Sequence, residues 1–220
     1  MSAAAQRPGE GVRALVEVMD RLRSPGGCPW DAAQTHASLV PYAIEEAYEV
    51  AEAVETDDRA GLREELGDLL LQVVFHARVA QEDADDPFDL DDVAAEVTAK
   101  LVRRHPHVFA DDAEHTGDLE DLHVQWDRIK AHEKQRASVL DGIPLALGAL
   151  GRAQKVVSRA QRAGRGDLVP RRGDGSLGER LLALVVEAHE TGVDTEQELR
   201  AATRELEARV RDAETRPPEE

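Results

Sequence analysis

The sequence predicts an all-α protein. Aromatic residues make up only 3% of the 220 residues, and the composition favours helices over strands. The clearest helical signal is a pair of acidic clusters, 45–49 and 64–68, in which acids three residues apart share one side of a helix. We therefore predict a helical bundle built around an antiparallel, carboxylate-bearing helix pair.

Apolar spacing and chain breakers set the order of the expected helices. The first helix ends at Ser24-Pro-Gly-Gly27, and a loop then runs to Ser38, which we expect to cap the next helix. Thr56-Asp57-Asp58 is the expected turn between the two carboxylate helices. In chain order, we expect helices over 11–23, 39–55, 58–82, 90–104, 119–136 and 145–163, with two more before residue 215.

The acidic clusters place four carboxylates opposite one another. Glu49 and Glu65 each lie eight residues from Asp57. Glu46 and Asp68 each lie eleven residues from it. If the helices fold back antiparallel, each pair lies at one height, and the pairs are about one helical turn apart at roughly 1.5 Å per residue. Four such carboxylates suit Mg²⁺, with Mn²⁺ as the alternative ion.

Solvated acidic helix faces are common, and this chain has 45 acidic against 27 basic residues. The apolar surroundings argue against that interpretation here, because Leu69–Phe75 makes its helix apolar nearly all round. Buried carboxylates without a cation cost several kcal/mol each. We therefore favour a metal site for the inner four acids, while Glu45 and Glu64 lie to the side. The same excess of apolar surface predicts a homodimer.

Composition narrows the class and compartment. A net charge of −18 argues against a general nucleic-acid-binding surface and suits a protein that binds cations. The single Cys28 excludes an intramolecular disulfide framework. No secretory signal pattern and no run of eighteen apolar residues occurs. We expect a cytoplasmic protein without a membrane span.

Two basic and aromatic groups follow the acidic clusters. Lys100, Arg103 and Arg104 share one side of a helix end, where they either complement the helix dipole or clamp phosphate oxygens. Trp126, four residues before Lys130, is either a core residue or a stacking surface beside a cation. The residues themselves leave both alternatives open.

The C-terminal part is a degenerate repeat of the N-terminal part. We place a boundary near Ser138, which separates domains 1–138 and 139–220. The stretch Leu177-Gly178-Glu179 resembles Leu66-Gly67-Asp68, with one inserted residue after it, but no Glu-x-x-Glu helix precedes it. We expect a structural or dimerising half without catalysis.

The carboxylate-bearing helices allow two other interpretations. Glu120-x-x-His123 matches half of the motif of di-iron or di-manganese bundle oxidases, but that motif is needed twice and occurs once. A non-catalytic helical scaffold would be favoured if the carboxylates were missing, and only the C-terminal half shows that loss.

Five stretches of the chain occur in an order that is specific to one family: Gly27-Cys-Pro-Trp-Asp31, Glu45-Glu46-x-x-Glu49, Glu64-Glu65-Leu-Gly-Asp68, Lys100-x-x-Arg-Arg-His-Pro-His-Val-Phe109 and Trp126-x-x-x-Lys130. On these stretches, residues 15–134 resemble the MazG family of nucleoside triphosphate pyrophosphohydrolases. The resemblance implies Mg²⁺-dependent hydrolysis of nucleoside triphosphates to the monophosphate and pyrophosphate, a nucleotide-pool house-cleaning activity.

The resemblance also implies residue roles. The family's metal ligands map onto Glu46, Glu49, Glu65 and Asp68. Its substrate contacts map onto Lys100, Arg103, Arg104, Trp126 and Lys130. A carboxylate that the metal does not fully engage, Glu45 or Glu49, is the candidate proton acceptor. Residues 145–159 resemble the start of the family's second domain, which departs from the pattern beyond that point, so we expect activity in the N-terminal domain.

Overall fold

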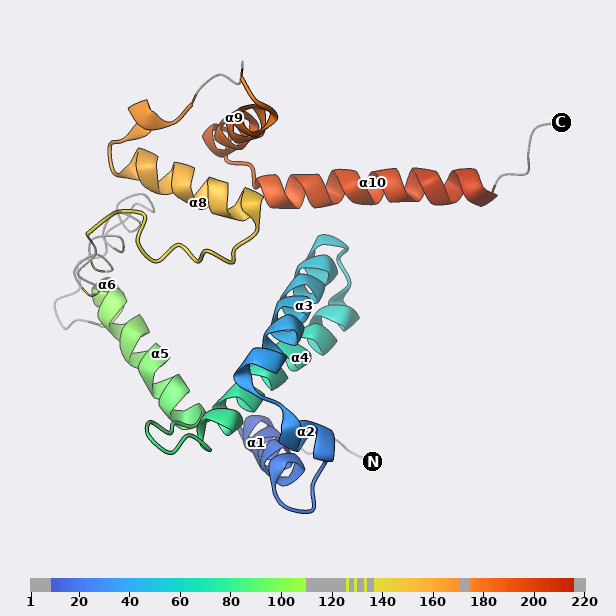
Figure 1. The fold of residues 1–220 in the computed structure, drawn as a ribbon, viewed down its shortest axis with the longest axis vertical. Coiled ribbons are helices and arrows are strands. Elements are labelled where there is room, and N and C mark those ends of the chain that lie inside the picture. Colours follow the sequence, from blue (N-terminus) through green and yellow to red (C-terminus); the bar gives the residue numbers. More distant parts are fainter. Residues whose placement is uncertain are drawn as a thin grey trace. The chain divides into compact units, whose positions relative to one another are not determined.

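The computed structural model describes residues 9–109, 126, 129, 133, 137–170 and 175–215. Every regular element in these residues is helical, as the sequence predicts. The chain folds as two compact units, Met1–Glu114 and His115–Glu220, which we call the N-terminal and C-terminal units (Figure 1). None of the described helices is both long enough and apolar enough to cross a membrane.

A helical hairpin dominates the N-terminal unit. Helices α3 (His36–Glu55) and α4 (Arg59–Ala80) run side by side and form the most extensive helix pair of the unit (Figure 1). Asp57 occupies the left-handed region at φ 55° in the predicted turn. Asp58 then caps α4, because its carboxylate accepts hydrogen bonds from the backbone N–H groups of Ala60 and Gly61 at 3.0 Å.

The start of α3 differs from the sequence prediction. Thr35, not Ser38, is the N-cap residue, and the helix begins three residues earlier than expected. The Thr35 hydroxyl accepts from the Ser38 backbone N–H at 3.2 Å, while the Ser38 hydroxyl accepts from the Thr35 N–H at 2.9 Å. Ser38 is therefore the third helical residue of a capping box, not its N-cap. Thr and Ser can both occupy the N-cap position, so the sequence alone does not show which of the two residues caps the helix.

Helix α1 (Glu10–Arg23) packs on α4, and a short helix α2 (Pro29–Ala33) lies in the segment predicted as loop. Pro29 starts α2 at a position where its missing N–H costs nothing. The core of the unit contains four buried side chains from three helices, each at most 3% exposed: Met19, Leu39, Val74 and Phe75. The core lies at the end of the hairpin away from the turn.

Arg23 joins these elements. Its guanidinium donates two hydrogen bonds to the Glu82 carboxylate, at 3.1 and 2.7 Å, and lies over the Phe75 ring. It also donates to the backbone carbonyls of Asp31, at 2.5 Å, and Gln34, at 3.1 Å. Because the Arg23 side chain is only 3% exposed, these contacts anchor the segment around α2 to the ends of α1 and α4.

Helix α5 (Leu90–Arg104) spans the predicted residues and packs on α4. Asp89 caps it in a box with Asp92. His105 ends α5, and Pro106 begins the short helix α6 (Pro106–Phe109). The helix expected at 119–136 lies outside the described residues, apart from three helical positions, Trp126, Ile129 and Glu133.

The C-terminal unit contains α8 (Ala149–Arg162), the 3₁₀ turn η1 (Gly166–Leu168), α9 (Leu177–Glu190) and α10 (Thr195–Thr215). Its core is a small group of valines, each at most 9% exposed: Val157, Val169, Val185 and Val186. The Gln154 side chain holds the start of α10 by accepting a hydrogen bond from the Thr195 hydroxyl at 3.0 Å.

The burial of α9 can be compared with that of α4 without the inserted residue that the sequence comparison suggested. When Gly178 is aligned with Gly67, the buried pair Val185–Val186 falls on the buried pair Val74–Phe75. With the insertion, Val185 falls on Val73, which is 41% exposed, so the burial pattern favours the register without it. The corrected register gives a position-by-position comparison of the two helices.

Candidate metal centre

Three of the four predicted carboxylates converge. Glu46 and Glu49 come from α3, and Glu65 comes from α4, with oxygen atoms of all three within 4.8 Å of one another. They meet because the turn at residues 56–58 folds α4 back along α3, which brings residues equidistant from the turn to the same height. Spacings of three residues keep the acids on one side of each helix.

Asp68 lies outside this group of three, but its charge acts on it. The Asp68 carboxylate is one of the causes that raise the pKa of both Glu46 and Glu65. Glu45, the alternative proton acceptor, is exposed and is not a member of the group. The hairpin therefore carries three clustered carboxylates with a fourth negative charge close by.

The electrostatics of the cluster fit a cation. Burial is the first cause that raises the pKa of Glu46, followed by the charges of Asp68 and Glu49. Burial also comes first for the pKa of Glu65, followed by the charge of Glu49. Ionising all of these groups brings like charges together, with Glu46 and Glu65 half-buried, and a divalent cation would remove that repulsion. Carboxylate oxygens are the ligands that hard divalent cations prefer.

The seam between α3 and α4 continues beyond the acids with polar residues that the sequence analysis missed. Gln72, four residues after Asp68, is 8% exposed, and its side-chain oxygen has no hydrogen-bond partner among the described residues. Farther along, His36 and His76 approach Nδ1 to Nδ1 at 2.8 Å. Spacings of four from Asp68 to Gln72 and from Gln72 to His76 are the signal that could have found them.

The two histidine rings meet edge to edge. Their planes differ by 8°, and their centres are 5.1 Å apart. With the two Nδ1 atoms only 2.8 Å apart, the nitrogens lie on the line between the ring centres, which is the geometry of an in-plane hydrogen bond. Burial, and then the charge of His36, lowers the pKa of His76. This bond ties the start of α3 to α4.

An aromatic group borders the same hairpin. Trp30 meets Tyr42 and Phe75 edge to face, with ring centres 6.0 and 6.4 Å apart. Tyr42 precedes Glu46 by four residues and therefore lies on the same side of α3. In the sequence, Trp30 stands out only as part of a family motif, because its aromatic partners are distant in the chain.

The predicted basic residues lie on the last two turns of α5, in the same unit as the acids. Lys100 and Arg104 are half-buried, and Arg103 is exposed. Trp126 is helical and half-buried in the C-terminal unit. Lys130 lies outside the described residues, as does the Glu120-x-x-His123 pattern.

Comparisons with known proteins identify the family that this chain resembles. The model of the MazG nucleotide pyrophosphohydrolase domain matches residues 34–109, which include all four acids. An uncharacterized 26.1 kDa protein of Streptomyces cacaoi is 51% identical, over 94% of this chain and 84% of that protein. A solved MazG-related protein of Thermotoga maritima matches with 33% identity and a TM-score of 0.44, over 54% of this chain and 97% of that chain.

Several other relatives have names that state an activity. The nucleoside triphosphate pyrophosphohydrolase of Escherichia coli K12 is 47% identical over 68% of this chain, which spans only 57% of that protein's length. The nucleoside triphosphate pyrophosphohydrolase/pyrophosphatase MazG of Thermotoga maritima is 37% identical over 87% of this chain and 81% of its own length. The chain therefore belongs to the MazG family.

Proposed function

We propose that this protein hydrolyses nucleoside or deoxynucleoside triphosphates to the monophosphate and pyrophosphate, using Mg²⁺, as a nucleotide-pool house-cleaning enzyme. The observation that supports this most directly is the group of Glu46, Glu49 and Glu65, with oxygens within 4.8 Å of one another. The group lies in the segment that matches the MazG domain. Its all-oxygen donor set is suited to Mg²⁺.

Each acid has a proposed role. Glu46, Glu49, Glu65 and Asp68 hold the cation, which when bound neutralises phosphate charge and lowers the pKa of a water molecule. Water oxygen bonds to the α-phosphorus, the bond to the bridging oxygen breaks, and the water proton passes to a carboxylate. Glu49 is better placed than Glu45 to accept this proton, because its carboxylate is both exposed and a member of the group.

The basic residues complete the proposal. Lys100, Arg103 and Arg104 neutralise the charge that develops on the departing pyrophosphate, and Arg suits phosphate because its planar fork binds two oxygens. Trp126 and Lys130 contact the nucleotide, as the family resemblance implies. No Walker-type phosphate loop occurs in the sequence, which agrees with hydrolysis at the α-phosphorus rather than transfer of the γ-phosphoryl group.

Catalysis is proposed for residues 1–138, with residues 139–220 as a non-catalytic repeat. In the corrected register, Glu179 of α9 falls on Asp68, but Ser176 falls on Glu65. A helix with paired acids opposite α9 is also missing from the sequence. The second half therefore keeps one of the four carboxylates, which is too few to hold the cation.

The N-terminal unit is proposed to form a homodimer through one face of the hairpin. Both helices carry an apolar stripe that remains between 36% and 52% exposed, formed by Val40, Ile44, Tyr48, Leu66, Leu70 and Val73. Rows of exposed apolar side chains on two neighbouring helices are typical of a surface that packs against a partner. Sedimentation at micromolar concentration should give a dimer for the wild type and for Val18→Glu, an exposed site on α1, but a monomer for Leu70→Glu.

A panel of canonical and damaged nucleoside triphosphates with Mg²⁺ tests the activity, with pyrophosphate and orthophosphate measured separately. Glu49→Gln and Asp68→Asn keep the side-chain shape and remove the charge, so turnover should fall roughly 100-fold or more with the helical content unchanged. Glu52→Gln, an exposed site on α3 outside the group, is the matched control and should keep its rate. Wild-type rates in both test variants would remove these acids from the mechanism.

A further inference from the structure

Gln72 of α4 carries a buried polar atom without a partner. The residue is 8% exposed, and its side-chain oxygen meets no hydrogen-bond donor among the described residues. Buried acceptors in folded proteins are nearly always paired with a protein group, an ordered water molecule or an ion, so an unpaired one indicates a missing ligand. The neighbours of Gln72 on α3 and α4 indicate which ligand this is.

Gln72 lies on the side of α4 that carries the candidate metal ligands. It follows Glu65 by seven residues and Asp68 by four, so all three share one face of the helix. Side chains on a helix lean toward its N-terminus, which for Gln72 is the direction of Asp68. Because α3 runs antiparallel to α4, the same rule tilts Glu46 toward the level of Gln72. The tilt of both side chains brings the amide toward Glu46, which is half-buried.

The chemistry of these groups restricts what can lie between them. The carboxylates of Glu46 and Asp68 and the amide oxygen of Gln72 all accept hydrogen bonds, and none of them donates one. A cation satisfies the carboxylates. Mg²⁺ usually keeps several of its water molecules when carboxylates bind it, and each of these water molecules has protons to donate. A water molecule on the ion would therefore also satisfy the amide oxygen.

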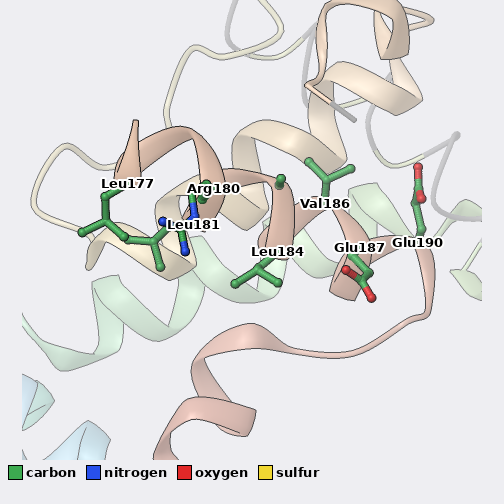
Figure 2. Close-up of a pocket in the computed structure, with 8 residues that line it drawn as sticks. Leu177, Arg180, Leu181, Leu184, Val186, Glu187 and Glu190 are labelled. Carbon is green, nitrogen blue, oxygen red and sulfur yellow. The ribbon is translucent and has the colours of Figure 1, made fainter. Parts of the chain in front are cut away.

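Helix α9 provides a comparison within the chain. In the register that aligns its buried valine pair with the buried pair of α4, Gln72 falls on Ala183. Ala183 lines an open hollow on α9 together with Leu184 and Glu187, whose side chains are drawn in Figure 2. In this register, α9 keeps the buried pair but has lost both the amide and one of the two acids of α4. This is the pattern expected if Gln72 serves the cation rather than the packing of α4.

We propose that Gln72 is a positioning residue of the metal centre, and that its amide oxygen accepts a hydrogen bond from a water molecule on the cation. The proposal rests on the cation of the proposed function and adds a residue outside its four ligands. Groups that bind a metal through such outer contacts typically change the affinity of the site 10–100-fold when they are removed. A water molecule bound without a cation would satisfy the oxygen equally well, and metal affinity separates the two cases.

Binding of Mg²⁺ alone to the full-length protein, measured by isothermal titration calorimetry, tests the proposal. Gln72→Met keeps the length of the side chain without the amide oxygen, and should raise the Kd for Mg²⁺ about tenfold or more. In EDTA, its midpoint of thermal unfolding should equal or exceed that of the wild type, because the unpaired buried oxygen is gone. Gln81→Met, at the exposed end of α4, is the matched control and should bind Mg²⁺ like the wild type.

Gln72→Glu keeps an acceptor oxygen at the same position and provides the rescue. It should bind Mg²⁺ at least as tightly as the wild type but unfold at a lower temperature in EDTA, because a fifth carboxylate joins the acids. Gln72→Leu, a second apolar variant, should match Gln72→Met. Wild-type affinity in the apolar variants, or an equal loss of affinity in Gln72→Glu, would overturn the proposal alone. A wild type that binds no Mg²⁺ would overturn the cation site, and this proposal with it.

Discussion

Replacing Arg23 with Ala should destabilise the N-terminal unit by about 3 kcal/mol. Hydrogen bonds to charged groups contribute about 1.5–3 kcal/mol each, and removing one partner of a buried ion pair costs about 3–5 kcal/mol. The lower end applies, because the Glu82 side chain is 46% exposed and can regain water. At about 4–8 °C per kcal/mol for a unit of this size, the midpoint of thermal unfolding should fall by more than about 10 °C.

Arg78→Ala is the matched control, because Arg78 also binds Glu82, at 2.8 Å, but pairs mainly at the surface. Its loss should cost about 1 kcal/mol. Both variants are compared with the wild type in urea unfolding followed by circular dichroism. Equal losses of unfolding free energy from the two substitutions would refute the idea that Arg23, besides pairing with Glu82, also anchors the segment around α2.

The dependence of stability on pH provides a second test of the contact between Arg23 and Glu82. The hydrogen bond from Arg23 is the largest cause holding the pKa of Glu82 below its ordinary value of 4.5. A carboxyl with a lowered pKa in the folded state stabilises the protein fully above its ordinary pKa, and that stability is lost as the pH falls through the lowered value. The Arg23→Ala variant should therefore lose less stability than the wild type on acidification below pH 4.5.

The carboxylate group and the domain boundary yield two further predictions. In EDTA, the free energy of unfolding should decline as the pH rises through and above the ordinary carboxyl range. The reason is that the pKa of Glu46 is raised in the folded state, which then holds charges that burial and neighbouring acids disfavour. Mg²⁺ should abolish this decline and Glu46→Gln should weaken it; a decline that persists in Mg²⁺ would count against a cation at this site. A folded, dimeric fragment of residues 1–138 should retain turnover, and an inactive one would show that the C-terminal half contributes to the site.

Local patterns were enough to predict the hairpin and the convergence of three acids. Glu46, Glu49 and Glu65 could be placed because helical period and distance from one turn determine their positions. The same patterns missed α2, which is too short for a periodic signal. They also missed the His36–His76 bond, which joins residues 40 positions apart. Such a contact depends on how α3 and α4 are rotated against each other, which spacing within one helix does not specify.

The position of Asp68 shows a finer limit. Its distance from the turn equals that of Glu46, and its charge does reach the cluster. Yet its oxygens lie outside the group within 4.8 Å. The helical period determines on which side of a helix a residue lies. The positions of its carboxylate oxygens around an ion also depend on the side-chain rotamer and on the ion itself.

Hydrolysis in ¹⁸O-labelled water tests the central claim most directly, because the position of the label identifies the phosphorus that water attacks. The products of a nucleoside triphosphate, formed with Mg²⁺, are separated and analysed by mass spectrometry. We expect the label in the nucleoside monophosphate, with unlabelled pyrophosphate as the other product. Label in pyrophosphate, or in orthophosphate released directly from the triphosphate, would show that water attacks a different phosphorus from the one proposed for this cluster of carboxylates.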